Sequence, residues 1–155
     1  MDGDLLPDGR REVSVLFTDL EGFGELTEKL GDGPVAALLS DYYAAVGHIV
    51  EKHGGVVDKL IGDCVFATFN AVAAVENHRQ IARKAGEEII AEISGLDAGG
   101  KPLRAAVYAA SGPAEVRTFT AGGHTATTVV GRTVNRAGRA MRRPRYGSVT
   151  DADLE

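Results

Sequence analysis

The stretch from Val56 to Phe69 restricts the possible folds of this chain more than any other. It reads V-V-D-K-L-I-G-D-C-V-F-A-T-F, with two short apolar runs, rich in β-branched and aromatic residues, on either side of Ile61-Gly62-Asp63. This pattern predicts a β-hairpin in which Gly62 supplies the unusual backbone angles of the turn. Lys59 and Asp63 then lie on opposite sides of the turn, either as solvated turn residues or as part of a site.

Length and composition are typical of one globular domain. The chain has 155 residues, of which 44% are apolar and 25% charged, enough to bury a core without disulfides or structural metals. The single cysteine, Cys64, leaves no intrachain disulfide and no cysteine-based zinc site. We expect a flexible leader over residues 1–10 and one domain over residues 11–155.

The charge and the N-terminal sequence narrow the partners and the compartment. A net charge of −5 argues against general affinity for nucleic acid or an anionic membrane. The N-terminus lacks the basic and apolar regions of a signal peptide, and no apolar run approaches membrane-spanning length. We therefore expect a cytoplasmic protein with no nucleic-acid partner and no membrane insertion.

A candidate phosphate-binding turn follows the first predicted strand, Val13 to Leu20. The strand ends at Asp19, and the sequence E-G-F-G over residues 21–24 precedes a helical pattern that starts near Glu25. A glycine-rich turn before a helix favours phosphate, because free N–H groups and the positive end of the helix dipole face the ligand. The same residues also fit an ordinary strand-to-helix turn.

The rest of the chain alternates helical and strand patterns. Apolar residues at three- and four-residue spacing predict helices over 32–53, over 71–93 and from Gly131 onward. Short β-rich runs predict strands over 103–110, 114–120, 125–130 and 146–150. Glycine and proline predict a loop over 94–102 and turns at 111–113 and 121–124.

Six arginines lie within fourteen residues near the C-terminal end. Four of them have +4, +3, +4 spacing and share one helical face, with Asn135 close by. Such a face is either solvated, or binds RNA, or grips a polyphosphate in bidentate fashion. The acidic total and the scarcity of aromatic residues weaken the RNA interpretation. The six are Arg132, Arg136, Arg139, Arg142, Arg143 and Arg145.

Three motifs, taken in order, resemble the class III nucleotide cyclase catalytic domain, the family of adenylyl and guanylyl cyclases. They are F-T-D-L-E-G-F at 17–23, H-G-G-V-V-D-K-L-I-G-D at 53–63 and T-V-V-G-R-T-V-N-R-A-G-R at 128–139. The similarity covers about Arg11 to Asp151. It implies an α+β fold with a ferredoxin-like βαββαβ core, extra strands, and an antiparallel sheet flanked by helices. It also implies a head-to-tail homodimer with its sites at the subunit interface.

The resemblance assigns a metal and phosphate role to one group of residues. Asp19 and Asp63 match the two metal-binding aspartates, and Leu20 matches the residue that lends its backbone carbonyl. Gly22 and Phe23, in the turn that follows, are expected to contact substrate. Carboxylate oxygens suit hard cations, so two Mg²⁺ or Mn²⁺ ions per site are expected.

A second group is implied to bind the nucleoside and to act in catalysis. Lys59 and Thr128 match the pair that reads the purine. Asn135 and Arg139 match the pair that positions the ribose and stabilises the transition state, where a fixed guanidinium offsets charge on the α-phosphate. In the family these four residues come from one subunit and the metal-binding aspartates from its partner.

The chemistry of Lys59 and Thr128 favours adenine over guanine. A lysine only donates hydrogen bonds, which suits N1 of adenine, whereas N1 of guanine carries a hydrogen. The hydroxyl of Thr128 can accept from the adenine amino group, and a mismatched base leaves polar groups unpaired. We therefore expect ATP to be cyclised to 3′,5′-cyclic AMP and pyrophosphate, by in-line attack of the ribose 3′-hydroxyl on the α-phosphate with two-metal assistance.

Two other interpretations remain open at the level of sequence. One is a catalytically weak cyclase homology domain that binds nucleotide and regulates a partner, because the V-Y-A-A-S-G-P-A-E-V run at 107–116 is unusual for the family. The other is a diguanylate cyclase or polymerase-like palm domain, and the missing G-G-D/E-E-F turn counts against it.

Overall fold

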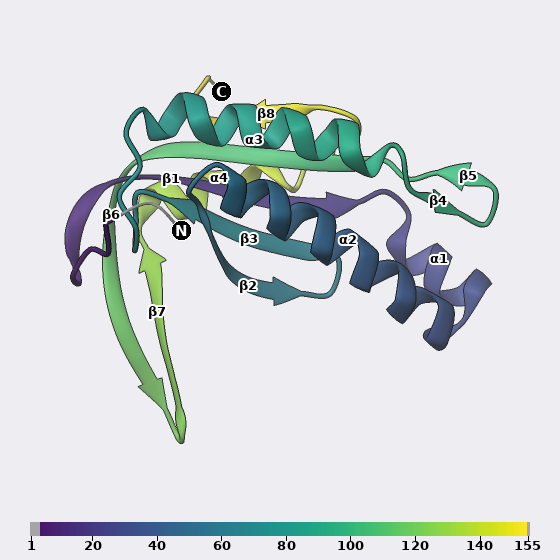
Figure 1. The fold of residues 1–155 in the computed structure, drawn as a ribbon, viewed down its shortest axis with the longest axis horizontal. Coiled ribbons are helices and arrows are strands. Elements are labelled where there is room, and N and C mark those ends of the chain that lie inside the picture. The colour runs from purple at the N-terminus through teal and green to yellow at the C-terminus, as the bar shows by residue number, and fades with distance from the viewer. Residues whose placement is uncertain (1–3, 155) are drawn as a thin grey trace.

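Residues 4–154 are described by a computed structural model (Figure 1). Along the chain the elements are β1 (Gly9–Leu20), α1 (Phe23–Leu30), α2 (Asp32–Lys52), β2 (Val56–Ile61), β3 (Cys64–Phe69), α3 (His78–Ile93), β4 (Asp97–Ala98), β5 (Lys101–Pro102), β6 (Ala105–Ala121), β7 (His124–Val130), α4 (Arg132–Ala140), β8 (Val149–Asp151) and the 3₁₀ helix η1 (Ala152–Leu154).

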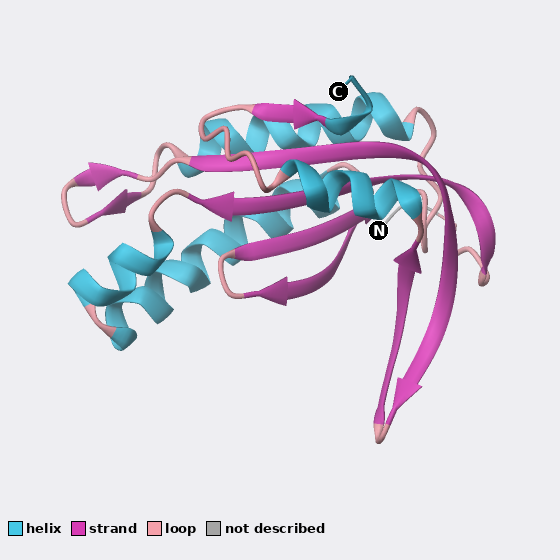
Figure 2. Cartoon of the chain, turned by 180° about the vertical axis from the view of Figure 1, so that it is seen from behind, coloured by secondary structure: helices cyan, strands magenta, loops and turns pink. Residues whose placement is uncertain are grey.

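The main sheet has the strand order β2-β3-β1-β6-β7, and β8 pairs with β6 in parallel. Strand β1 lies in the middle and runs antiparallel to both β3 and β6. The order β2-β3-β1-β6, joined by helices between β1 and β2 and between β3 and β6, is that of a ferredoxin-like βαββαβ core. The predicted α+β fold, an antiparallel sheet flanked by helices, is confirmed (Figures 1 and 2).

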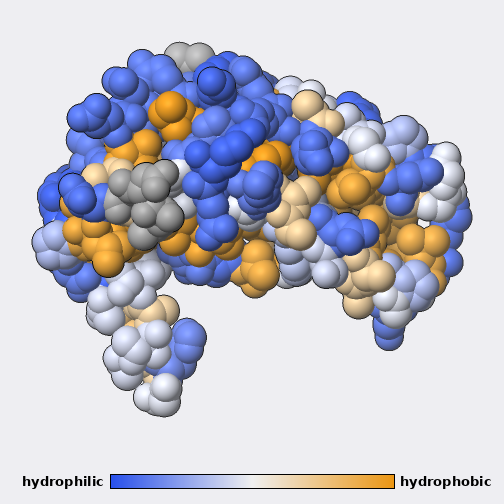
Figure 3. Space-filling model, viewed as in Figure 1, coloured by the Kyte–Doolittle hydropathy of each residue, from blue (hydrophilic) through white to orange (hydrophobic). Residues whose placement is uncertain are grey.

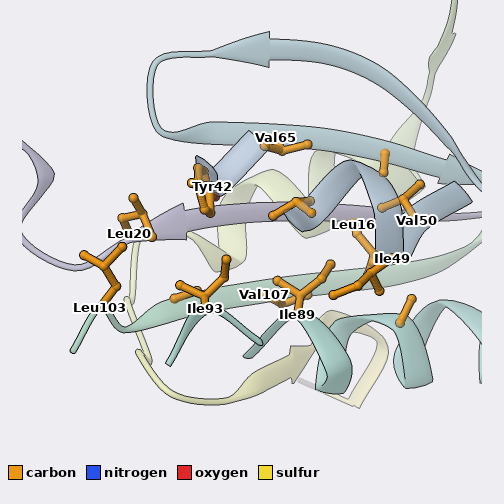
Figure 4. Packing of buried hydrophobic residues seen from close by; sticks show 14 of the residues in the cluster. Leu16, Leu20, Tyr42, Ile49, Val50, Val65, Ile89, Ile93, Leu103 and Val107 are labelled. Atoms are coloured by element: carbon orange, nitrogen blue, oxygen red, sulfur yellow. The ribbon is translucent and has the colours of Figure 1, made fainter. Parts of the chain in front are cut away.

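Alternation along β1 gives the sheet two buried faces. Even-numbered residues such as Leu16 and Leu20 join a core with side chains of α2 and α3, among them Tyr42 and Ile89 (Figure 4). Odd-numbered residues Val13 and Val15, with Phe17 partly buried beside them, face the other way into a second cluster that includes Ala137 of α4. Because successive strand side chains point to opposite faces, β1 is buried on both sides.

The predicted hairpin is confirmed. Strands β2 and β3 pair from Val56↔Thr68 to Ile61↔Cys64, and Gly62 and Asp63 form the two-residue loop between them. Gly62 has a φ of 58°. It occupies the first loop position, where type II′ hairpin turns carry glycine because residues with a Cβ are strained there.

The helix predicted from Ala71 begins seven residues later, at His78. Residues 71–77 form bends, an isolated bridge from Ala73 to Leu5 and a turn, and the Leu6 N–H donates to the Val72 carbonyl at 3.0 Å. Asn77 has a φ of 54°, a left-handed conformation that a continuous helix excludes. The prediction was wrong because the alanines here are buried by tertiary packing rather than by a helical face, as Ala71 and Ala73 show.

The turn predicted at residues 111–113 is also wrong, because β6 runs through it without interruption. Gly112 pairs with Val13, and Pro113 with Glu12. Side chains from the C-terminal part of the chain bind the backbone there: the Ser111 N–H donates to Asp153 Oδ2 at 2.8 Å, and Thr133 Oγ1 donates to the Pro113 carbonyl at 2.8 Å. These partners lie 42 and 20 residues away, beyond the reach of a local turn rule.

Three smaller differences concern connections. The predicted loop at 94–102 contains the short antiparallel pair β4–β5. Strand β1 starts at Gly9, inside the predicted leader, and Asp4 accepts a hydrogen bond from the Ala74 N–H at 2.8 Å. The predicted last strand at 146–150 starts three residues later, as β8.

None of the helices described has both the length and the apolar character needed to cross a lipid bilayer.

The β6–β7 hairpin extends away from the body of the sheet (Figures 1 and 2). Its outer part is rich in threonine, and the projecting arm is mostly pale in the surface view of Figure 3. Threonine pairs bond across the arm, with Thr118 Oγ1 and Thr127 Oγ1 at 2.7 Å. Phe119 is exposed on it.

Candidate functional site

Two carboxyl groups meet where β1 ends and the β2–β3 hairpin turns. Asp19 is the penultimate residue of β1, and Asp63 is in the hairpin loop. The backbone N–H of Leu20 donates to Asp63 Oδ2 at 3.0 Å, so the carboxylate of Asp63 lies against the backbone that follows Asp19. The structure thus brings together three of the residues expected to bind metal.

Two tyrosines of α2 hold the hairpin loop in place. The Tyr42 hydroxyl donates to the Asp63 carbonyl at 2.8 Å and also bonds Thr18 Oγ1. The Tyr43 hydroxyl donates to the Gly62 carbonyl. Tyr42 is fully buried beneath the loop, between Leu20 and Val65 in Figure 4. The sequence indicated α2 as an amphipathic helix but gave no sign of this second role.

Electrostatics around Asp19 favour the arrival of a positive charge. Burial, and then the nearby negative charge of Asp63, raise the pKa of Asp19 to about 6. Oδ1 of Asp19 is buried and has no hydrogen-bond partner among the described residues. Burial and the charge of Asp19 also raise the pKa of the Cys64 thiol to about 11. An unpaired buried carboxylate oxygen is unusual, because burying it without a partner costs free energy.

The donor set fits a hard divalent cation better than a soft one. It consists of carboxylate oxygens and the backbone carbonyl of Leu20, and within residues 4–154 no group of three or more His, Cys, Asp or Glu side chains is arranged so that it could hold a metal ion by itself. Mg²⁺ is commonly bound by one or two carboxylates together with substrate phosphates and water. Asp19 and Asp63 meet that requirement.

The turn after β1 has the form expected for close backbone approach. Gly22 has a φ of 67° and precedes α1, which begins at Phe23, two residues before the predicted start near Glu25. The Gly22 carbonyl accepts from the Leu26 N–H at 2.9 Å, and Phe23 packs against the core on the side of α2. Gly22 is exposed and follows Asp19 by three residues.

Lys59 and Thr128 contact each other although they lie on opposite edge strands of the sheet. Lys59 Nζ is 3.4 Å from Thr128 Oγ1. Strands β2 and β7 are the two edges of the sheet, and β7, paired to the long β6, comes close enough to β2 for these side chains to touch. The pair predicted to read the purine is therefore formed within one chain.

Asp58 contacts both residues of this pair, and the sequence analysis did not identify it as a site residue. Thr128 Oγ1 donates to Asp58 Oδ2 at 2.7 Å, and Asp58 Oδ1 lies 3.5 Å from Lys59 Nζ. The pairing of β2 with β3 shifts between Val57 and Lys59, which makes Asp58 the extra residue of a β-bulge. A bulge turns neighbouring side chains to one side, whereas regular alternation, the only signal in the sequence, separates them.

Asn135 and Arg139 are exposed on α4, one helical turn apart. Their neighbour Arg136 is different, because its guanidinium bonds Asp153 Oδ1 at 2.8 Å and the Ser111 carbonyl at 3.0 Å. The predicted arginine face thus contains one structural ion pair. Arg139 and Arg143 line a common hollow with Arg136.

The sheet face opposite α2 and α3, on which α4 packs, carries Lys59 and Asp19. Lys59 Nζ lies 5.6 Å from the ring centre of Phe66, which stacks on Phe17 at 4.5 Å in the α4-side cluster. Asp19 follows Phe17 by two residues and therefore faces the same way. Among the described residues, no hydrogen bond or ion pair links Asp19 or Asp63 to Lys59, Thr128, Asn135 or Arg139.

Solved cyclase structures have this fold. The adenylyl cyclase CyaB from P. aeruginosa superposes with a TM-score of 0.77 and 28% identity, covering 93% of this chain and 78% of that chain. The guanylyl cyclase Cya2 superposes with a TM-score of 0.75 and 26% identity, covering 96% of this chain and 76% of that chain.

Sequence comparison gives the same family. Adenylate cyclase 1 of Rhizobium meliloti (strain 1021) is 32% identical over 122 residues, which is 79% of this chain but only 17% of the relative's own length. The family model described as the adenylate and guanylate cyclase catalytic domain matches residues 7–144. This chain belongs to the family of adenylate and guanylate cyclase catalytic domains.

Proposed function

We propose that this chain converts ATP to 3′,5′-cyclic AMP and pyrophosphate. The observation that carries the proposal is the carboxyl pair at the end of β1, where buried Asp19 Oδ1 has no hydrogen-bond partner within residues 4–154 and Asp63 lies beside it. A cation bound there would supply the missing interaction and offset both the burial and the repulsion from Asp63 that raise the pKa of Asp19. The known adenylate cyclase relative supports the same chemistry.

Asp19, Asp63 and the Leu20 carbonyl would hold two Mg²⁺ or Mn²⁺ ions. When bound, such ions acidify a hydroxyl and offset negative charge on phosphates. Gly22 and Phe23 stand at the start of helix α1, where free backbone N–H groups would face the phosphates of ATP. The residues at the end of β1 thus orient the triphosphate for in-line attack by the ribose 3′-hydroxyl.

Asn135 and Arg139 would act on the reacting centre from α4. Both are exposed, and Arg139 has no carboxylate partner among the described residues, so its guanidinium is free to bind an anion. A guanidinium fixed beside the α-phosphate stabilises the charge that builds there in the transition state. Asn135, one turn earlier, would position the ribose by hydrogen bonding.

Lys59 and Thr128 would select adenine. Their contact at 3.4 Å puts a donor next to an acceptor, the arrangement that complements N1 and the amino group of adenine. ATP is therefore the proposed substrate. Guanylyl cyclases among the structural relatives have the same fold, so the fold alone does not determine which purine is bound.

A homodimer would complete the site. Lys59 lies beside the ring of Phe66 on the sheet face where α4 packs, and Asn135 and Arg139 are exposed on α4. Exposed apolar residues near this face, Leu60 and Ile61 of β2 and Val130 of β7, favour contact with a second copy of the chain. Two copies packed head to tail would bring the carboxyls of one against Lys59, Thr128, Asn135 and Arg139 of the other.

The test is cyclic AMP formation from ATP and Mn²⁺ by the purified chain. Asp63→Ala and Arg139→Ala should each lose activity, and a mixture of the two inactive variants should regain part of it, because one of the two hybrid sites has all its residues. The exposed Asp97→Asn is the matched control and should keep the activity of the parent chain.

Two results would contradict the proposal in different ways. Nucleotide binding without cyclic AMP formation would favour a regulatory nucleotide-binding module. Activity of the parent chain with no recovery in the mixture would overturn the shared site and leave the cyclase activity standing.

A further inference from the structure

Asp58, Lys59 and Thr128 form a closed polar cluster. The three contacts are Thr128 Oγ1–Asp58 Oδ2 at 2.7 Å, Lys59 Nζ–Asp58 Oδ1 at 3.5 Å and Lys59 Nζ–Thr128 Oγ1 at 3.4 Å. The side chain of Asp58 is 8% exposed, and that of Lys59 is 44% exposed. The carboxylate therefore lies behind the pair, while the lysine head remains accessible to a ligand.

The carboxylate of Asp58 fixes the direction of the Thr128 hydroxyl. A carboxylate only accepts, so the hydroxyl hydrogen must be directed to Asp58 Oδ2. One lone pair of Thr128 Oγ1 then faces Lys59, and the other remains for a ligand. Towards a ligand, the cluster presents an acceptor at Thr128 and a donor at Lys59.

We propose that Asp58 is a positioning residue that sets the polarity of Thr128 and thereby the choice of ATP over GTP. The inference deepens the proposed function and rests on it. Adenine places an acceptor at N1 and a donor at its amino group, which match the donor of Lys59 and the acceptor of Thr128. Guanine in the same placement presents N1–H to Lys59 and O6 to Thr128, so both contacts are mismatched.

Reversing the polarity of Thr128 should remove one of these two mismatches. In Asp58→Asn the amide can donate to Thr128 Oγ1, and the hydroxyl hydrogen becomes available to O6 of guanine. The ratio of kcat/KM for ATP to that for GTP should fall about tenfold relative to the parent chain, the effect of one buried hydrogen-bond mismatch. Asp58→Ala also frees the hydroxyl hydrogen and should lower the ratio, and Asp58→Glu should keep it high.

A double-mutant cycle shows whether Asp58 acts through Thr128. In a Thr128→Ala background there is no hydroxyl to orient, so adding Asp58→Asn should leave the ATP to GTP ratio unchanged. Asp97→Asn, which removes an exposed carboxylate far along the chain, is the control for the loss of charge. Thermal unfolding of each variant establishes that the folded protein is being compared.

Binding measurements separate this inference from the proposed function. Displacement of a fluorescent ATP analogue by ATP and by GTP gives the same ratio without turnover, so it is measurable even if the chain makes no cyclic AMP. The inference is overturned if Asp58→Asn and Asp58→Ala both keep the parent ratio, or if Asp58→Asn shifts the ratio equally with and without the Thr128 hydroxyl.

Discussion

The hydroxyl of Tyr42 donates to the backbone carbonyl of Asp63 at 2.8 Å, from a side chain that is fully buried under the hairpin loop. This contact joins helix α2 to the loop that carries one of the two candidate metal ligands. The position of the Asp63 carboxylate therefore depends on a helix that contributes no side chain to the candidate site itself.

Tyr42→Phe tests that dependence. The substitution keeps the ring but leaves the Asp63 carbonyl and Thr18 Oγ1 without this partner, so we expect a loss of about 1–2 kcal/mol in the free energy of unfolding. The apparent KM for Mn²⁺ in cyclic AMP formation should rise, because Asp63 is less well fixed. Tyr43→Phe removes a more exposed hydrogen bond at Gly62 and should have a smaller effect on both. Equal effects of the two substitutions would argue against a special role of Tyr42.

Asp19→Asn should stabilise the metal-free protein, with a pH dependence set by the raised pKa of Asp19. The pKa of about 6 in the folded state exceeds the ordinary aspartate pKa of 3.8, so ionising Asp19 costs folding free energy. This cost is absent below about pH 4, grows as the pH rises through the window between the two pKa values, and is complete above about pH 6. Unfolding with EDTA present should show Asp19→Asn more stable than the parent at pH 7.5. The difference should shrink towards pH 4.5, and a gain that does not change with pH would contradict the assignment.

Divalent cations should stabilise the parent chain through the same two carboxyls. We expect Mn²⁺ to stabilise the folded chain by about 2.7 kcal/mol of unfolding free energy at a hundred times the dissociation constant, and the melting temperature should continue to rise with the logarithm of the Mn²⁺ concentration above it. EDTA should reverse the effect, and both Asp19→Asn and Asp63→Asn should abolish it. The Asp97→Asn variant should retain the full rise, so a rise in the Asp63→Asn protein would place the cation elsewhere.

Gly55→Ala should destabilise the fold through a direct clash. A Cβ on Gly55 would lie 2.5 Å from a ring atom of Phe69, a core side chain with no exposed surface. Overpacking of this kind typically costs about 1–3 kcal/mol. Gly47→Ala, in the middle of α2 where an added Cβ meets nothing within 4 Å, is the matched comparison and should stabilise the helix by up to about 1 kcal/mol. Denaturant unfolding of the two variants should give opposite signs.

Local patterns in the sequence were sufficient for most of the fold. The β2–β3 hairpin and helix α2 were predicted near their observed bounds, and β1 ends at Leu20 as predicted, because alternating or helical spacing and glycine turn chemistry act over a few residues. The two clear errors, at residues 71–77 and 111–113, occur where distant segments bind the backbone. Leu6 does so in the first case, and Asp153 and Thr133 in the second.

Short motifs, whose order and spacing are visible along the chain, were enough to predict the family, the type of sheet and the residues expected to do chemistry. Only the tertiary structure decided that Asp63 bonds the backbone next to Asp19, that Lys59 meets Thr128 across the two sheet edges, and that Asp58 stands behind them. The physical reason is that these contacts join residues 43 to 70 positions apart. They depend on the course of the β6–β7 hairpin, which brings β7 close to β2, and on a bulge in β2. Neither feature leaves a periodic signal in the amino-acid sequence.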